Sequence, residues 1–262
     1  MRVPTHPLHL PLLVLSLLVA LVGAACGGTT PSKPELTDPK AIIAAAATEA
    51  AAAQGVHVDA SVDGRLTLDL LGAGSGGAPV DLTGTTAAAD LELRGGDARV
   101  TFAIASAIRG ELLSVDGVAY LKTTLSGAQY QVQEGFPTIP PNAIPAALNT
   151  LLDILEEPGL EPVMEADVDC AGGTCYRVSL ALTMDDLAEL GMELPAGLPA
   201  GLGEASVDVT MDVSRETHRL SGLEAVVTQP DGETLTLVAT FSKWDEPVTV
   251  EAPPADEIAP AE

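Results

Sequence analysis

The sequence has few aromatic residues, few basic residues and little histidine. It contains one Trp, three Tyr and three Phe in 262 residues, so Ala, Leu, Val and Gly supply most of its apolar side chains. Asp and Glu number 37 against 12 Lys and Arg, which gives a net charge of −25. A chain this acidic neither neutralises nucleic-acid phosphates nor attaches to anionic lipid headgroups through a basic patch. Nucleic-acid binding and peripheral membrane binding through a basic patch are therefore excluded.

Long apolar runs are also scarce, and the one that stands out is Leu10–Val22 near the N-terminus. Arg2 precedes it, and the small residues Gly23, Ala24 and Ala25 follow it. This run has the length of a signal-peptide core and is too short to span a bilayer comfortably as a helix. We expect residues 1–25 to be a signal peptide that is removed on export.

Cys26 comes directly after these small residues. A short run of small residues that ends in Cys resembles the lipobox of bacterial lipoproteins, in which the thiol of the first mature residue carries diacylglycerol. We predict that Cys26 is lipidated and holds a mature chain of charge −26, after the loss of Arg2, at the extracytoplasmic face of the cell membrane. Residues 26–37 are predicted to be a flexible tether. The alternatives are a secretory signal followed by an unrelated Cys, and an uncleaved anchor.

With Cys26 assigned to lipid, Cys170 and Cys175 remain as a pair separated by Ala-Gly-Gly-Thr. In an exported protein, two cysteines around a Gly-containing hairpin tip indicate a local disulfide. Closing so small a loop contributes only about 2 kcal/mol, so the bond fixes a turn rather than the whole fold. A redox or metal pair needs a two-residue spacer or further His and Cys ligands, and the sequence has neither.

A helix is predicted over Lys40–Gln54, because Asp38 and Pro39 are typical of the N-cap and the first helical position. Gly55 is predicted to end it. Its expected buried face is Ile42, Ile43, Ala46 and Ala50.

After this helix, apolar and polar residues alternate, which indicates half-buried strands. We expect the first strand to bend at Gly64, and the Asp116-Gly117 pair predicts a tight hairpin. The strands expected in this part of the chain are 56–70, 80–93, 99–107, 111–115 and 118–122.

The second part of the chain begins with another helix, which Asn142 is expected to cap. Thr183 and Asp186 predict a short third helix that ends near Gly191, and residues 192–203 predict an apolar Pro/Gly loop. The wide apolar face of the second helix is Ile144, Ala147, Leu148, Leu151, Leu152 and Leu155. The strands expected here are 163–170, 175–182, 205–213, 220–229, 234–244 and 248–251.

These elements predict one α+β domain over residues 38–252, followed by a disordered acidic tail over residues 253–262. Alternation on nearly every strand leaves one face of the sheet wet and the other apolar. The expected fold is therefore a single curved antiparallel sheet with three helices packed on its concave face.

Catalytic signals are poor. His57 and His218 are the histidines outside the signal segment, and we expect both to be solvated surface residues. Ser75 lacks the first Gly of a nucleophile elbow and lies in a Gly-rich loop. Asp167 and Asp169 resemble the start of a calcium loop, but Ala171 and Val178 occupy later ligand positions, so coordination fails. We therefore predict no enzymatic activity, no cofactor and no metal.

The apolar residues of the helices and of the 192–203 loop leave two interpretations open. They form an ordinary packed core, or the sheet and helices close incompletely around an apolar cavity. Small side chains on the inner face favour the cavity, because they leave volume for a ligand.

Three segments resemble a known family. They are the helix and strand over Asp38–Leu70, the hairpin Val115–Leu121, and the closing Thr240–Pro254 with its Ser-Lys-Trp-Asp-Glu-Pro-Val-Thr-Val core. With the lipobox, they are similar to the actinobacterial LppX/LprA/LprF/LprG lipoproteins over nearly the whole mature chain. The resemblance implies a half-barrel sheet with helices inside the curve around an apolar cavity. It also implies carriage of lipids or glycolipids across the cell envelope, often alongside a membrane exporter.

We therefore predict a monomeric, membrane-anchored lipoprotein that binds an acylated lipid or glycolipid in an apolar cavity and has no nucleic-acid partner. The alternatives are a structural or partner-binding envelope lipoprotein with a packed core, and a hydrolase, for which the sequence offers no catalytic pair. The residues expected to line the cavity are Val58, Ala60, Val62, Leu66, Leu68, Phe102, Ile104, Leu148, Leu151, Leu152, Leu155, Leu235, Leu237 and Phe241.

Overall fold

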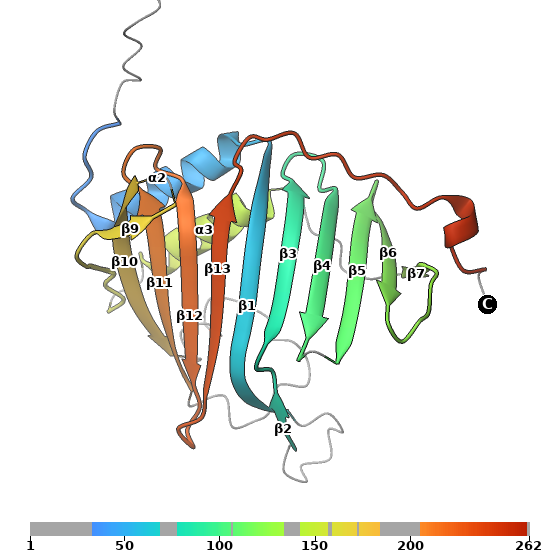
Figure 1. The fold of residues 1–262 in the computed structure, drawn as a ribbon. Helices are drawn as coiled ribbons and strands as arrows, with labels where there is room; N and C mark the ends of the chain where they lie inside the picture. Colours follow the sequence, from blue (N-terminus) through green and yellow to red (C-terminus); the bar gives the residue numbers. More distant parts are fainter. Residues whose placement is uncertain are drawn as a thin grey trace, which may run out of the picture. The chain divides into compact units, whose positions relative to one another are not determined.

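The alternating segments form one antiparallel sheet that curves without closing into a barrel (Figure 1). The structure is a computed structural model, and it describes residues 33–68, 78–105, 107–133, 142–156, 159–171, 173–183 and 205–260. Residues 35–262 belong to one compact unit. No helix in the described ranges is long and apolar enough to cross a membrane.

The first and last long strands of the chain pair with each other in the middle of the sheet. β1 (Gly55–Leu68) lies between β13 (Thr234–Ser242) and β3 (Thr85–Glu92). The sheet continues beyond β3 through β4 (Ala98–Ile104), β5 (Ile108–Val115), β6 (Val118–Thr123) and β7 (Gln131–Gln133). On the other side it continues through β12 (Leu220–Thr228), β11 (Ser206–Ser214), β10 (Gly173–Thr183) and β8 (Val163–Met164). Two short strands pair outside this order: β2 (Ala78–Asp81) with β1, and β9 (Val168–Cys170) with β10. This confirms the predicted curved half-barrel.

Helix α2 (Pro39–Ala52) begins where the sequence predicts, since the Asp38 side chain accepts a hydrogen bond of 3.1 Å from the Ala41 amide. Its predicted buried face is confirmed, and Ala47 joins it. The prediction that Gly55 ends the helix is wrong. The helix ends at Ala52, and Gly55 is the first residue of β1. A Cβ at Gly55 would lie 2.9 Å from the Glu246 carbonyl, so a glycine is needed for the close approach of that segment.

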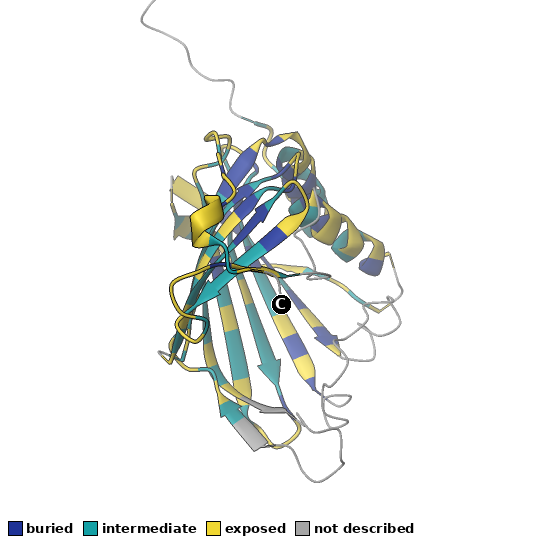
Figure 2. Cartoon of the chain, turned by 90° about the vertical axis from the view of Figure 1, so that its right-hand side faces the viewer, coloured by how far each residue is buried: buried dark blue, intermediate teal, exposed yellow. Residues whose placement is uncertain are grey.

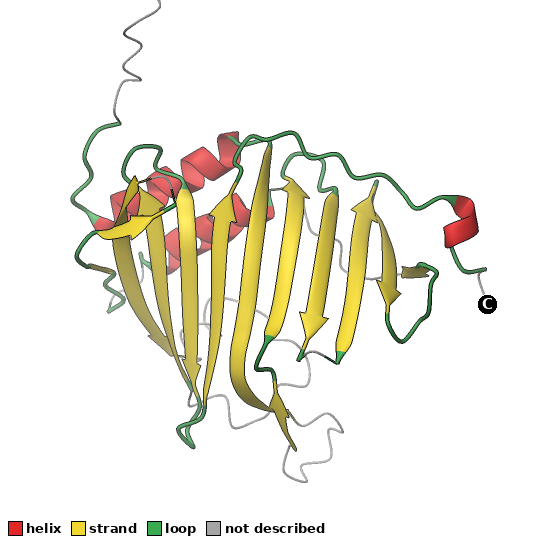
Figure 3. Cartoon of the chain, viewed as in Figure 1, coloured by secondary structure: helices red, strands yellow, loops and turns green. Residues whose placement is uncertain are grey.

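Helix α3 (Ala143–Ile154) follows Asn142, which adopts a left-handed conformation (φ 60°) and makes no side-chain capping bond. The Asn142 amide donates to the Leu93 carbonyl instead (2.9 Å). Both helices pack against the same face of the sheet, near one end of its strands (Figure 3). There they form a core cluster with β10 and β11 whose members include Tyr176, Val178 and Met211.

Several predicted strands differ from the observed ones. A turn at Leu82–Gly84 divides the segment 80–93 into β2 and β3, which pair along different stretches of β1. Residues 163–170 form two short strands, and residues 248–251 form none. The predicted third helix and the 192–203 loop lie outside the described residues.

The prediction of a disordered tail is wrong for residues 253–260. The Tyr130 amide donates to the Glu257 carbonyl, and the Ala259 amide donates to the Tyr130 carbonyl, both at 2.8 Å. Farther back, Val248 and Val250 pack with Tyr130 against Leu113. The charged composition suggested disorder, but these contacts come from parts of the chain that are distant in sequence.

Candidate functional site: the apolar concave face

The strand registers place one continuous series of side chains on the face that carries the helices. Met211 pairs with Leu223, Leu223 with Ala239, and Ala239 with Ala60, so the series runs from the core cluster across to β1. On the six strands in and beside the middle of the sheet, the members of this series are Val56, Val58, Ala60, Val62, Thr85, Ala87, Ala89, Leu91, Ala98, Val100, Phe102, Ile104, Ile108, Gly110, Leu112, Ser114, Leu223, Ala225, Val227, Leu235, Leu237, Ala239 and Phe241.

None of these positions holds an ionisable side chain, and their two hydroxyl groups belong to Thr85 and Ser114. Thr123 on the neighbouring β6 adds a third, since it pairs with Gly110. The face therefore offers apolar contact and almost no hydrogen bonding. A ligand held there is recognised by its hydrocarbon, because a charged group would lose its hydration without gaining a partner.

On β1, β3 and β4, burial along this apolar face falls from one end of the strands to the other, whereas β10 and β11 stay buried as far as Leu182 and Val207. At the helix-covered end, Val56, Leu91 and Ala98 are 0%, 9% and 1% exposed. At the opposite end, Ile104 and Leu237 are 38% and 36% exposed. Figure 2 shows buried segments beside the helices, with further buried bands lower on some strands. We call the less buried part of these strands the open part of the concave face. It extends from Val58 on β1 to the exposed ends at Ile104 on β4 and Leu237 on β13.

The centre of the open part is lined by small residues. Ala60 faces Ala239 on one side and Ala87 on the other, and Ala87 faces Phe102. The Phe102 ring lies over Gly110, where a Cβ would come within 2.4 Å of it. Glycine at 110 therefore leaves room for the Phe102 ring beside the backbone of β5.

The predicted cavity residues fall into three groups. Val58, Ala60, Val62, Phe102, Ile104, Leu235, Leu237 and Phe241 share the concave face, as expected. Leu148 and Leu155 are buried in the core cluster, and Leu151 and Leu152 pack against it. Leu66 and Leu68 lie in β1, but their side chains are outside the described part of the structure. An enclosed cavity among them stays a prediction.

The convex face is polar, and it carries a hollow of about 500 Å³ over β1, β3, β4 and β13. Most of its lining residues, including Ser61, Thr86 and Thr101, alternate with the apolar series and so lie on the opposite side of the sheet. This hollow is therefore distinct from the predicted apolar cavity.

Both histidines are more enclosed than the sequence suggested. His57 is 18% exposed on the convex face, with its Nδ1 2.6 Å from Asp90 and its Nε2 3.3 Å from Asp59. His218 is buried in the turn between β11 and β12, so the prediction that it is a solvated residue is wrong. Its left-handed backbone (φ 58°) turns the ring inward, 6.4 Å from the ring of Tyr176.

The Cys170–Cys175 disulfide is formed, with 5.9 Å between the Cα atoms, and it joins β9 to β10. The neighbouring Asp167, considered above as a calcium ligand, pairs with Arg215. No group of three or more His, Cys, Asp or Glu side chains in the described residues is arranged to hold a metal ion. Ser75 lies outside the described part of the chain.

The convex side of β5 and β6 is covered by the C-terminal segment through Tyr130. Its hydroxyl donates to Glu111 (2.6 Å), and burial together with this hydrogen bond raises the pKa of Tyr130 to about 12. The ring also lies 5.1 Å from the Lys122 ammonium. The contacts of Tyr130 with Val250, Glu257 and Ala259 hold the C-terminal segment on the convex face, away from the apolar one.

No family model matches the sequence, and no curated protein matches it. Among solved structures, the fold is similar to that of LprF from Mycobacterium bovis, with a TM-score of 0.50, 15% identity, and 82% of this chain and 96% of that chain covered. Looser superpositions exist with the lipoprotein LppX of Mycobacterium tuberculosis (TM-score 0.38, 15% identity, 81% and 98% covered) and with a LolA superfamily protein of Nitrosomonas europaea (0.28, 11%, 86% and 99%).

The chain thus has the half-barrel fold seen in LprF. The resemblance of the sequence to the LppX/LprA/LprF/LprG lipoproteins is confirmed at the level of the fold, since LprF has this fold.

Proposed function

We propose that this chain is a membrane-anchored envelope lipoprotein that binds an acylated lipid or glycolipid on its concave face and carries it. The single observation that carries the proposal is the open part of the concave face. Large apolar side chains there, such as Ile104 and Leu237, stay more than a third exposed although they lie inside the curve of a sheet.

The energetics favour hydrocarbon as the occupant. Each methylene transferred from water to this face contributes about 0.8 kcal/mol, so one acyl chain supplies several kcal/mol even with partial burial. The inner-face series offers no ionisable partner, so binding depends on chain length and volume rather than on a defined hydrogen-bond pattern.

Anchoring and location rest on the N-terminal sequence. We infer that residues 1–25 are removed, that Cys26 carries the lipid anchor, and that the domain works at the extracytoplasmic face of the membrane. A membrane exporter is the partner that the family resemblance implies. An anchored carrier suits a setting in which acyl chains must leave a membrane without contacting water.

The test compares two neighbouring alanines on β3 that point to opposite faces. Ala87 pairs with Ala60 and Phe102 in the concave series, whereas Ala88 pairs with Asp59 and Thr101 and lines the convex hollow. Both are half-buried, so Ala87→Trp and Ala88→Trp add the same bulk to the same strand.

Each protein is purified gently from its own host and its bound lipid is measured by native mass spectrometry. We expect the wild type and Ala88→Trp to carry lipid, and Ala87→Trp to carry about tenfold less, because an overfilled apolar site loses the contacts of several methylenes. Lipid lost only in Ala88→Trp would place the ligand in the convex hollow. A wild-type protein without lipid would favour a structural or partner-binding lipoprotein.

A further inference from the structure

At the open end of the concave face, the apolar series ends in a charged side chain. On β13 the series runs Phe241, Ala239, Leu237, Leu235, and the next position in the same alternation is Glu233. The Gln229 amide donates to the Glu233 carbonyl (2.8 Å), so the strand pairing extends to this residue. Among the described residues, Glu233 is therefore the first ionised group along β13 beyond the apolar series.

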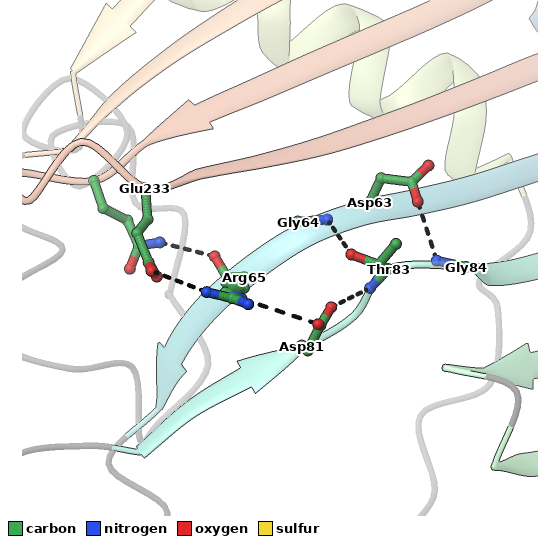
Figure 4. Close-up of polar contacts among 8 residues, drawn as sticks. Asp63, Gly64, Arg65, Asp81, Thr83, Gly84 and Glu233 are labelled. Carbon is green, nitrogen blue, oxygen red and sulfur yellow. Dashed lines mark hydrogen bonds and ion pairs between the residues drawn. The ribbon is translucent and has the colours of Figure 1, made fainter.

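Arg65 lies beside Glu233, at the point where β1 leaves the main sheet to pair with β2 (Figure 4). Its guanidinium is 3.9 Å from Glu233 and 3.9 Å from Asp81. Its carbonyl accepts a hydrogen bond of 2.9 Å from the Gln229 side chain, which fixes the backbone at this corner. Both ion-pair distances exceed a hydrogen bond, so a hydroxyl oxygen beside the pair can lie within hydrogen-bond distance of both Arg65 and Glu233.

A separate observation concerns the second carboxylate oxygen of Glu233, which lacks a donor. Oε2 of Glu233 is buried and accepts no hydrogen bond within the described ranges, although Oε1 faces Arg65. A buried acceptor without a partner costs free energy, and a donor from a ligand removes that cost. The group that best suits this oxygen is a hydroxyl.

The charge of the same corner disfavours an anionic ligand. Asp81 and Glu233 flank the one guanidinium of Arg65 (Figure 4). Asp81 stays ionised, since hydrogen bonds from the Thr83 amide and hydroxyl lower the pKa of its carboxyl group. The described positions of the concave series hold no cation, and two carboxylates face the one guanidinium at the corner. A phosphate headgroup would therefore meet no cation inside and a net negative charge at the end.

We propose that Arg65 and Glu233 form a headgroup site for an uncharged, hydroxyl-bearing lipid, such as a glycosyl diacylglycerol. Arg65 donates to a headgroup hydroxyl oxygen, Glu233 accepts from a hydroxyl, and the acyl chains lie along the open part of the concave face. This inference rests on the proposed lipid-carrier function and adds the chemistry of the headgroup to it.

The experiment uses two lipids with identical dioleoyl chains, glucosyl-dioleoylglycerol and dioleoylphosphatidylglycerol, which both carry hydroxyls but differ in the phosphate. Each competes with fluorescent cis-parinaric acid for the delipidated full-length chain. We expect the glucosyl lipid to bind about tenfold more tightly at low salt, the ratio that a hydrogen bond to a charged group supplies.

The variant Glu233→Gln keeps the shape of the side chain and removes its charge, and it should reduce the ratio to about twofold or less. Glu216→Gln makes the same chemical change in the exposed turn between β11 and β12, at the other end of the sheet, and should leave the ratio unchanged.

Equal affinity of the wild type for the two lipids, or equal ratios in both variants, would overturn the headgroup site while leaving the carrier function intact. Failure of both lipids and of parinaric acid to bind at all would overturn the carrier function and the headgroup site together.

Discussion

Gly64 marks the place where β1 turns from the main sheet toward β2, and its replacement by alanine gives a sharp test of the structure. Gly64 has φ +121°, in a region that residues with a side chain rarely adopt. A Cβ there would lie 2.1 Å from the Thr234 carbonyl oxygen and 3.1 Å from the Leu235 Cα. Both contacts are with backbone atoms of β13, so no side chain can move aside.

The cost of Gly64→Ala has two parts. The left-handed conformation costs an alanine about 1–2 kcal/mol. Relieving the contact with Thr234 requires β1 and β13 to separate at their last paired residues, Gly64 and Leu235, which adds about 1–3 kcal/mol by analogy with an overfilled core. We therefore expect a loss of about 2–5 kcal/mol in the free energy of unfolding.

Gly117 is the matched control. It also has positive φ (+78°), but a Cβ there meets nothing within 4 Å. Gly117→Ala should thus lose only the conformational part, about 1–2 kcal/mol. Both variants reduce the entropy of the unfolded chain equally, so that effect cancels in the comparison.

Urea unfolding followed by circular dichroism measures the difference. With an m-value of about 2–3 kcal/mol per M, the Gly64→Ala midpoint should fall about 1 M below that of Gly117→Ala. Equal midpoints would refute the argument, because they would mean that the contact with Thr234 does not constrain Gly64.

Two further predictions concern the convex face and the disulfide. Tyr130→Phe removes the hydrogen bond to Glu111 and should cost about 1.5–3 kcal/mol in urea unfolding at pH 7. Because the pKa of Tyr130 is raised to about 12, this contribution should be complete below pH 10 and disappear as the pH rises through 12. If the difference in the free energy of unfolding between wild type and variant stayed constant up to pH 12, the argument would be contradicted. Reduction of Cys170–Cys175 should lower the free energy of unfolding by about 2 kcal/mol, as expected for so short a loop, and leave parinaric acid binding unchanged. Loss of binding on reduction would show that the β9–β10 hairpin shapes the ligand site.

Features that depend on neighbouring residues were predictable from the sequence. Asp38 caps α2 because its carboxylate reaches an amide three residues later. Asp116 and Gly117 both have positive φ (51° and 78°), as a two-residue hairpin turn requires. The Cys170–Cys175 pair spans a turn that brings its ends together without help from the rest of the fold.

Features that depend on distant residues were not predictable. His218 looks like a solvated turn residue, but its burial is created by Tyr176 from another strand. The tail after Pro253 has a composition typical of disorder, but it is held by the backbone of Tyr130, more than a hundred residues earlier. Glu233 lies in a polar turn, and only the register of β12 with β13 shows that it continues the concave series.

By itself, the sequence determined which residues share a face, since in a strand the side chains alternate with a period of two whatever the strand packs against. It thereby determined that one face of the sheet is apolar and the other polar. Only the tertiary structure decided which part of the apolar face is covered, because covering it requires α2 and α3 to pack across β10 and β11. The helices bury one end of the face completely and leave Ile104 and Leu237 partly exposed at the other, where Arg65 and Glu233 meet.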